Sequence, residues 1–369
     1  MTSVVRVIAS LSVAVATATL VAQAPSWKDA APGRPIVLPA DHASHPDYKV
    51  EWWYYTGNLD STGARRFGYQ LTFFRVGLDS APTNPSRWAV RDLFMTHLAL
   101  TDADGKRYRF VDRINRSGPG WAGAATDGYR VWNEGWQAGH GPDAVHRLVA
   151  STKDFGIDLR LDEGRRAVFH GDHGYSRKGS AAGNASFYYS LTRMPTQGTV
   201  TIDGRAIEVR GQSWMDHEFG TTFLETDQVG WDWFSVQLDD GRDLMLFQLR
   251  RRDGSVDPRS SGTLVEPDGA ARHIAFDSGF SIEPGRVWTS SASGGRYPVE
   301  WQVRLPRESI DLSVRAVLDD QELRTGQSTG INYWEGAIDV KGRANGRPVQ
   351  GRGYLEMTGY SGRGLEALR

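Results

Sequence analysis

Residues 50–59 read VEWWYYTGNL and residues 67–75 read FGYQLTFFR, with a short polar turn between them. Aromatic and β-branched residues of this kind favour strands, and a short polar connection between two such runs predicts a hairpin. A second hairpin of the same kind is predicted in the other half of the chain, with an Asp-Gly turn between its strands. Its two runs are residues 231–239, WDWFSVQLD, and residues 243–250, DLMLFQLR. The two halves of the chain therefore contain the same kind of hairpin.

Turn signals of the same type recur along the whole sequence. Asp-Gly and Asn-Gly pairs supply the positive φ angles that two-residue hairpin turns need. They occur at Asp104-Gly105, Asp203-Gly204, Asp240-Gly241, Asp253-Gly254, Asp268-Gly269 and Asn345-Gly346. Helical periodicity is confined to two short candidates, residues 143–153 and 319–324. We therefore expect an almost entirely all-β protein.

A second pair of segments indicates an internal duplication. Residues 198–216, GTVTIDGRAIEVRGQSWMD, align with residues 336–356, GAIDVKGRANGRPVQGRGYLE, when two residues are inserted near the second turn. Two matches in the same order favour a repeated β unit, and a hairpin-rich unit must close or cover its strand edges. We expect two β-barrel or sandwich domains, residues 33–210 and 211–369. The alignment matches Gly211 with Gly351, Trp214 with Tyr354, and Asp216 with Glu356.

The N-terminal residues 1–24 have the layout of a signal peptide, with Arg6, an uncharged run and a small-residue end at Ala22-Gln23-Ala24. The run is shorter than the roughly 20 apolar residues that a membrane span needs, although an uncleaved N-terminal anchor is the alternative. Residues 25–32 would be a linker. Cysteine is absent, so an exported chain must fold without disulfides. We expect a secreted or periplasmic protein with no transmembrane segment in the mature chain.

The composition excludes several classes of partner. The net charge is −1 and the charges are interspersed, so nucleic acid is not indicated as a partner. The 13 Trp, 13 Tyr and 14 Phe residues suit strands and apolar pockets. The chain has no P-loop, no H-E-x-x-H motif and no cysteine nucleophile. A hydrophobic small molecule is the expected ligand or substrate.

The stretch at 211–234, GQSWMDHEFGTTFLETDQVGWDWF, contains the candidates for catalysis. Side chains alternate along a strand, so Asp216 and Glu218 share one face and His217 lies on the other. Two enclosed carboxylates repel, which raises the pKa of one of them, and His217 titrates near neutral pH. A solvent-facing acidic edge is the alternative interpretation. The aromatic frame for a substrate would be formed by Trp214, Trp231 and Trp233.

The strand at 50–59 supplies further candidates, because Glu51, Trp53 and Tyr55 share one of its faces. The opposite face is also aromatic, so the strand is either buried on both sides or lines a cavity on one side. We include these three residues among the candidates for substrate binding. Core packing is the alternative for the aromatic rings.

Two weaker patterns carry less weight. His42 with His45, and His170 with His173, are spaced as ligand pairs, but neither pair has a third ligand at a recognisable spacing. We therefore expect no metal site and no cofactor. Ser328 lies in a G-x-S-x-G match, yet a nucleophile elbow needs a strand before it and a helix after it, and a strand-like run follows here.

Four motifs together resemble the AttH/CrtC-like family of bacterial secreted proteins, which is also described as carotenoid 1,2-hydratase-like or as predicted secreted hydrolases. The resemblance covers nearly all of the mature chain and implies two lipocalin-like β-barrel domains. It also implies lyase chemistry, the addition of water to an alkene without an organic cofactor. The motifs are HPDYKVEWWYYTGNL, GQSWMDHEFG, GWDWFSVQLDDGRDLMLFQLR and YWEGAIDV…GRGYLEMTGY.

The same resemblance points to two short patterns associated with activity in the carotenoid hydratases. The aromatic-x-Asp pair matches Trp214-Met215-Asp216. The upstream His-x-Trp pair corresponds to Phe187-Tyr188-Tyr189, which lacks the histidine. The resemblance thus adds Tyr189 to the candidates for substrate binding, while the chain departs from the family pattern at the histidine.

Our leading hypothesis is an exported, cofactor-independent hydratase or lyase acting on a hydrophobic small molecule. Asp216, assisted by His217 or Glu218, would protonate an alkene, and the tryptophan faces would stabilise the developing cation. A periplasmic lipocalin-like binding or carrier protein is the second hypothesis, since such barrels commonly hold one small ligand. A hydrolase is the third.

Overall fold

The computed structural model describes residues 26–362 except 142, 144 and 223. Over these residues the chain is almost entirely β, as predicted, with one short α-helix and two 3₁₀ turns. None of the helices described is long and apolar enough to cross a membrane. The proposed signal peptide, residues 1–24, lies outside the described residues.

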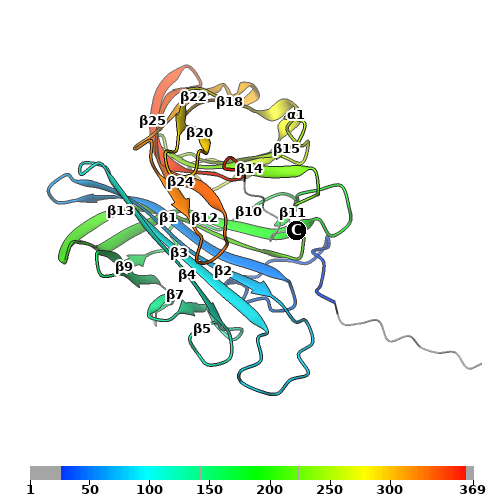
Figure 1. Ribbon diagram of the computed structural model, residues 1–369. Helices are drawn as coiled ribbons and strands as arrows, with labels where there is room; N and C mark the ends of the chain where they lie inside the picture. The colour runs from blue at the N-terminus through cyan, green and yellow to red at the C-terminus, as the bar shows by residue number, and fades with distance from the viewer. Residues whose placement is uncertain (1–25, 142, 144, 223, 363–369) are drawn as a thin grey trace, which may run out of the picture.

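The first sheet forms a nearly closed barrel from the N-terminal half of the described chain (Figure 1). Its path runs β4-β3-β2-β1-β13-β12-β9-β8-β7-β6-β5, and β10 and β11 pair with β12. The barrel closes where β6 approaches β3, and Asn133 Nδ2 on β6 donates to Thr96 Oγ1 on β3 at 3.0 Å. The 3₁₀ turn η1 (Ala40–His42) precedes the strands, which are β1 (Val50–Ser61), β2 (Arg66–Gly77), β3 (Asp92–Asp102), β4 (Arg107–Arg116), β5 (Ala122–Ala124), β6 (Arg130–Asn133), β7 (Trp136–His140), β8 (His146–Ser151), β9 (Phe155–Leu161), β10 (Val168–Phe169), β11 (Tyr175–Arg177), β12 (Ala185–Ile202) and β13 (Arg205–Gly220).

The second sheet is built from the C-terminal half and lies above the first in Figure 1. Its path runs β17-β16-β15-β14-β25-β24-β22-β21-β18, with β23 paired to β24, and β19 pairs separately with β20. Its elements are β14 (Gln228–Leu238), β15 (Asp243–Arg251), β16 (Ser261–Val265), β17 (Ala271–Ala275), α1 (Phe276–Gly279), β18 (Ser281–Pro284), β19 (Val287–Thr289), β20 (Arg296–Pro298), β21 (Glu300–Leu305), η2 (Pro306–Glu308), β22 (Ile310–Ala316), β23 (Glu322–Arg324), β24 (Asn332–Ala344) and β25 (Arg347–Met357).

The two paths have the same order of strands, which agrees with an internal duplication. Strands β4 to β1, β13, β12, β9, β8 and β7 correspond in turn to β17 to β14, β25, β24, β22, β21 and β18. The register gives residue equivalences: Tyr54 lies opposite Asp216, and Trp233 lies opposite Glu356. The duplicated unit is therefore a lipocalin-like barrel, present twice.

The hairpins predicted at 50–75 and 231–250 are confirmed by the pairing of β1 with β2 and of β14 with β15. The two helix candidates were wrong. Residues 146–151 form β8, whose alternate side chains are buried, and the helical pattern at 319–324 gives way to the pairing of β23 with β24. Position 210/211, where the sequence analysis divides the chain, lies within β13 of the first sheet. We propose the division at 221–227, between the sheets.

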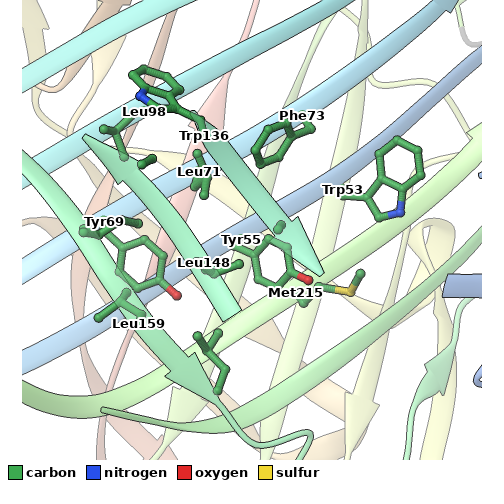
Figure 2. Close-up of a cluster of buried hydrophobic side chains, with 14 of the residues drawn as sticks. Trp53, Tyr55, Tyr69, Leu71, Phe73, Leu98, Trp136, Leu148, Leu159 and Met215 are labelled. Carbon is green, nitrogen blue, oxygen red and sulfur yellow. The ribbon is translucent and has the colours of Figure 1, made fainter. Parts of the chain in front are cut away.

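Three clusters of buried side chains make up most of the core. The first fills the interior of the N-terminal barrel with aromatic and aliphatic side chains, among them Trp53, Tyr55 and Trp136 (Figure 2). The second fills the C-terminal barrel. The third joins the barrels and includes Tyr54, Tyr188 and Trp233. The functional site described next lies in this third cluster.

Candidate active site

A cavity of about 110 Å³ lies between the two barrels. Its walls are predominantly aromatic, but they also contain four carboxyl groups and one ammonium group. Such a combination of an apolar surface and a few convergent polar groups is typical of small-molecule sites. The lining residues are Trp52, Tyr54, Thr72, Phe74, Lys178, Tyr188, Asp216, Glu218, Leu224, Trp231, Trp233, Phe247, Leu249, Glu335 and Glu356.

The duplication explains why these residues meet. Because side chains alternate along a strand, β1 directs Trp52 and Tyr54 to the cavity, and β14 directs Trp231 and Trp233 there from the other barrel. The pairings of β1 with β13 and of β14 with β25 make these two pairs equivalent. The cavity is thus enclosed by the same face of each repeat.

Asp216, on β13, is buried at the wall of the cavity and accepts hydrogen bonds from three side chains. Trp214 Nε1 donates at 2.6 Å and Tyr188 Oη at 2.7 Å. Ser190 Oγ donates at 2.5 Å. Burial raises the pKa of Asp216 to about 7, and the nearby Glu218 adds to this, although the three donors oppose the shift. Asp216 therefore changes charge near neutral pH.

The second repeat contributes two more acids. Glu335 on β24 and Glu356 on β25 are cross-strand neighbours. Burial raises the pKa of Glu356 to about 7, against a hydrogen bond from Trp231. Burial, together with the charge of Glu356, raises the pKa of Glu335 well above its ordinary value, although Tyr54 Oη donates to Glu335 at 2.5 Å. Like charges this close in a dry site favour retention of a proton.

Glu218 differs from the other three acids because a cation accompanies it. Lys178 Nζ lies 3.0 Å from Glu218 Oε1, and Ser186 Oγ donates to the same carboxylate. The ammonium group also lies 4.3 Å from the centre of the Phe247 ring and 4.9 Å from that of Tyr188. Glu218 is thus held as part of an ion pair, which leaves Asp216, Glu335 and Glu356 as the carboxyl groups able to exchange protons.

His217 lies on the opposite face of β13, inside the first barrel, as the alternation predicts. Its Nε2 is 3.0 Å from Glu51 Oε1, and its Nδ1 is 3.0 Å from Tyr189 Oη. Burial lowers the pKa of His217 to about 4, against the hydrogen bond with Glu51. Trp53 stacks on the imidazole ring with centroids 4.9 Å apart. His217 therefore cannot assist Asp216 directly.

Glu51 is held inside the same barrel by opposite charges. Burial opposes ionisation of Glu51, but the bonds with His217 and His45 and the charge of Arg75 bring its pKa well below the ordinary value. Arg75 Nε lies 3.1 Å from Glu51 Oε2. Among the predicted site residues, four lie toward the barrel interior: Glu51, Trp53, Tyr55 and Tyr189. Four others line the cavity: Asp216, Glu218, Trp231 and Trp233. Trp214 lies in the cluster between the barrels and supports Asp216 by a hydrogen bond.

Sequence reasoning missed several cavity residues. The repeat alignment matched Glu356 with Asp216, yet Glu356 was not among the candidates for catalysis. On the strand at 50–59, the residues that line the cavity are Trp52 and Tyr54, on the face opposite the predicted candidates Glu51, Trp53 and Tyr55. The signal that could have identified them is the duplication itself, because Trp52 and Trp231 are equivalent. Lys178 lies outside the four sequence motifs, so neither the motifs nor the repeat pointed to it.

Ser328 lies in the loop between β23 and β24, so it does not form a strand-to-helix elbow. Its Oγ donates to Asp112 Oδ2 at 2.8 Å and lies 2.9 Å from His97 Nε2. Because the hydroxyl proton is directed to Asp112, His97 donates to Ser328 and is not placed as its base. These bonds attach the loop to the first barrel.

His170 and His173, one of the two histidine pairs noted in the sequence, lie in different environments. His170 is buried, with Nε2 2.6 Å from Ser190 Oγ and Nδ1 2.8 Å from Thr263 Oγ1, whereas the His173 side chain is 99% exposed. Since Ser190 donates to Asp216, His170 Nε2 donates to Ser190 and thereby orients the hydroxyl. His170 thus supports the cavity acid from behind.

Comparison with known proteins identifies relatives of this arrangement. The family model described as AttH-like matches residues 29–360. The crystal structure of an AttH protein from Nitrosomonas europaea is 33% identical, with a TM-score of 0.82 over 90% of this chain and 99% of that one. No curated protein matches the chain at a significant level.

Two more distant structures share the fold. Kievitone hydratase from Nectria haematococca is 14% identical, with a TM-score of 0.70 over 90% of this chain and 95% of that one. CghA is 12% identical, with a TM-score of 0.51 over 85% of this chain and 88% of that one. At these identities the likeness concerns the arrangement of the paired barrels.

Proposed function

The chain belongs to the AttH-like family, and from this premise we propose that it is a hydratase or lyase acting on the alkene end of a hydrophobic small molecule. The observation that supports the proposal is a set of three buried carboxyl groups with raised pKa values in one aromatic cavity. The fold shared with kievitone hydratase is compatible with this chemistry. A general acid works best when its pKa lies near the operating pH.

Glu356, sharing a proton with Glu335, is the acid that we propose. Asp216 accepts three hydrogen bonds, which stabilise its anion. Glu356 instead lies beside another carboxyl group and accepts a bond from Trp231, so its neutral form is favoured. This differs from our expectation that Asp216 donates the proton. In the present proposal Asp216 is the carboxylate that stabilises positive charge and receives the proton from water.

The proposed addition proceeds in two steps. The O–H bond of Glu356 breaks as a C–H bond forms at one alkene carbon, which leaves a cation at the other carbon. The faces of Trp52, Trp231 and Trp233 and the anion of Asp216 stabilise that cation. Water then forms the C–O bond, and its proton passes to Asp216. Proton transfer between the two acids restores the starting state, and the reverse sequence is a dehydration.

The cavity volume limits the part of the substrate that reacts inside it. An apolar cavity of roughly 150 Å³ holds a benzene molecule, so about 110 Å³ accommodates a small branched alkene end. The remainder of a longer substrate would extend past Trp52 and Trp231, which are only partly buried. A terminal isoprenyl group fits this description.

The test begins with mass spectrometry of small molecules retained by the native protein, followed by incubation of those molecules and of a panel of terminal isoprenyl alkenes in D₂O. Hydration predicts a product that gains one water and carries one deuterium bound to carbon. Glu356→Gln should lower the rate of this incorporation by about 10²–10⁴-fold. Asp232→Asn is the matched control, because Asp232 is another buried acid with a raised pKa that does not line the cavity.

Recovery of every retained ligand unchanged, with no deuterium incorporated, would instead support the carrier function. The interior of the first barrel is packed with side chains (Figure 2), so such a carrier would hold its ligand between the barrels. Export to the periplasm or beyond remains our proposal from residues 1–24, and secretion of a reporter fused to these residues tests it.

A further inference from the structure

Four side chains from three separate segments of the first barrel converge at one point. His42 belongs to η1, His140 and His146 face each other across β7 and β8, and Glu163 lies in the loop after β9. One ligand atom from each lies within 4.8 Å of the ligand atoms of the other three. The group is distinct from the cavity, which none of these residues lines.

Four of the six distances between the ligand atoms are close to those of a tetrahedral metal site. Zinc binds imidazole nitrogen and carboxylate oxygen at about 2.0–2.2 Å, so its tetrahedral ligands lie roughly 3.3–3.6 Å apart. Glu163 Oε1 is 3.3 Å from His42 Nε2, 3.6 Å from His140 Nε2 and 3.5 Å from His146 Nε2. The two nitrogens of His140 and His146 are 3.1 Å apart.

Neighbouring tyrosines orient two of the imidazole rings. Tyr189 Oη lies 2.6 Å from His42 Nδ1, and Tyr55 Oη lies 2.8 Å from His146 Nδ1. Bonds to Nδ1 direct Nε2 toward the common point, which is the usual support for a metal-binding histidine. His42 Nε2 is fully buried and makes no well-aligned hydrogen bond with any of the described residues, although Glu163 Oε1 lies 3.3 Å away. Such a buried nitrogen is costly unless a ligand satisfies it.

The chemistry of the donors also suits zinc. Each of the four side chains offers one ligand atom, an imidazole nitrogen from each histidine and a carboxylate oxygen from Glu163. Three imidazoles and one carboxylate form a donor set that suits zinc.

The second barrel lacks this group. The strand pairing makes Pro284 equivalent to His140 and Trp301 equivalent to His146. Trp301 packs edge-on against Phe234, with centroids 5.5 Å apart, at the place where Tyr55 meets His146 in the first barrel. Apolar packing therefore occupies this position in the second barrel, whereas the four polar side chains occupy it in the first.

We propose that His42, His140, His146 and Glu163 bind one zinc ion. Four protein ligands close the coordination sphere, which is the arrangement of structural rather than catalytic zinc. The ion would attach η1 and the loop after β9 to the β7–β8 hairpin, at the end of the barrel. The Glu163 side chain is 41% exposed, so the ion can enter from solvent.

The test uses the mature protein carrying no histidine tag. Elemental analysis after growth in zinc-supplemented medium should find one zinc per chain. Removal of the metal with a chelator, followed by addition of ZnCl₂ at about 100 times its dissociation constant, should raise Tm by roughly 4 °C. Cobalt in the same site should give the intense visible absorption of tetrahedral Co²⁺.

Two variants locate the site, and one controls for the loss of a histidine. His140→Ala and Glu163→Gln each alter a partly exposed ligand, so both are expected to fold, and both should lose the zinc-dependent rise in Tm. His173→Ala removes an exposed histidine that is not part of the group, so this variant should retain the zinc-dependent rise in Tm. The proposal is overturned if ZnCl₂ leaves the Tm of the metal-free wild type unchanged, or if both ligand variants still bind zinc stoichiometrically.

Discussion

The two barrels share their strand order but differ in what lies inside them. Toward the cavity, the two copies present equivalent side chains: Asp216 corresponds to Glu356 and Tyr54 to Trp233. Toward its interior, the first barrel carries a buried polar network of Glu51, Arg75 and His217, whereas the second is filled mainly with apolar side chains. The face common to both repeats is therefore the one that forms the cavity.

Individual positions show how the interiors diverged. Following the register one residue at a time, Glu51 corresponds to Gly230 and His217 to Met357. Arg75 corresponds to Arg250, which pairs with Asp232 at 3.1 Å instead. The second barrel thus retains an arginine but has lost the histidine network. This comparison separates a shared acid site from polar structure that is specific to the first repeat.

The largest expected effect tests whether the two equivalent acids have different roles. Glu356→Gln removes the proposed proton donor and should lower kcat by about 10²–10⁴-fold, with the pH profile of the residual activity flattened. Asp216→Asn should also lower kcat. Wild-type activity should fall as pH rises above about 7, because Glu356 must be protonated, and should also fall as pH drops below about 7, because Asp216 must be ionised. Steady-state kinetics against pH on an identified substrate provides the measurement.

Glu218→Gln serves as the comparison within the same cavity. Its carboxylate is paired with Lys178 and has no proposed proton-transfer role, so the change should alter KM more than kcat. An unchanged pH profile in Glu356→Gln, together with full activity, would mean that the proton comes from another group.

The equivalent arginines should differ in their contribution to stability. Arg75→Met leaves Glu51 ionised in a fully buried position, and breaking a buried pair in this way costs about 3–5 kcal/mol. Arg250→Met should cost less, because burial already raises the pKa of Asp232 and this acid can take up a proton. Urea unfolding of both variants gives the comparison, and equal losses would contradict it.

A smaller effect concerns pH and the free energy of unfolding. The pKa of Glu356 is raised from 4.5 to about 7 on folding, so the folded state binds more protons than the unfolded state between these values. Its contribution to stability is present below pH 4.5 and is lost as pH rises to about 7. Glu356→Gln should thus stabilise the protein at pH 8 by up to about 3 kcal/mol.

Denaturant curves at pH 5 and pH 8 distinguish this from a general effect of the substitution. The gain should be present at pH 8 and much reduced at pH 5. A variant that is equally destabilised at both pH values would show that the raised pKa does not act on folding.

The sequence predicted the fold in detail because local signals and the repeat agreed. Alternating apolar residues and Asp-Gly or Asn-Gly turns fixed the central hairpins, and the alignment around Trp214 and Tyr354 located the repeat. The errors arose where a strand resembled a short helix. Residues 146–151 become β8 because they pair on both sides with the adjacent strands β7 and β9. No Asp-Gly or Asn-Gly pair marks the connections between these strands, so the turn signal that marks other hairpins of the chain is absent there.

Only part of the candidate site could be predicted from the sequence, because the rest depends on how the strands pair and how the barrels meet. Alternation assigned Asp216 and His217 to opposite faces, but the sequence does not show which face of β1 or β13 meets the other barrel. His140 and His146 became neighbours only through the β7–β8 hairpin, which the helical interpretation of 143–153 concealed. Contacts between distant segments determine both sites.

The smallest expected effect concerns the tight turn between β12 and β13 and its equivalent between β24 and β25. Substitution of the glycine should have the same effect on stability in both turns. The β12–β13 turn has positive φ at Asp203 (49°) and Gly204 (77°), and the β24–β25 turn has positive φ at Asn345 (52°) and Gly346 (76°). A Cβ added at either glycine meets no atom within 4 Å, so alanine costs only the left-handed conformation, about 1–2 kcal/mol. Gly204→Ala and Gly346→Ala should lower the free energy of unfolding equally, as measured by urea denaturation. A marked difference would mean that the two repeats, despite their common order of strands, do not use this turn in the same way.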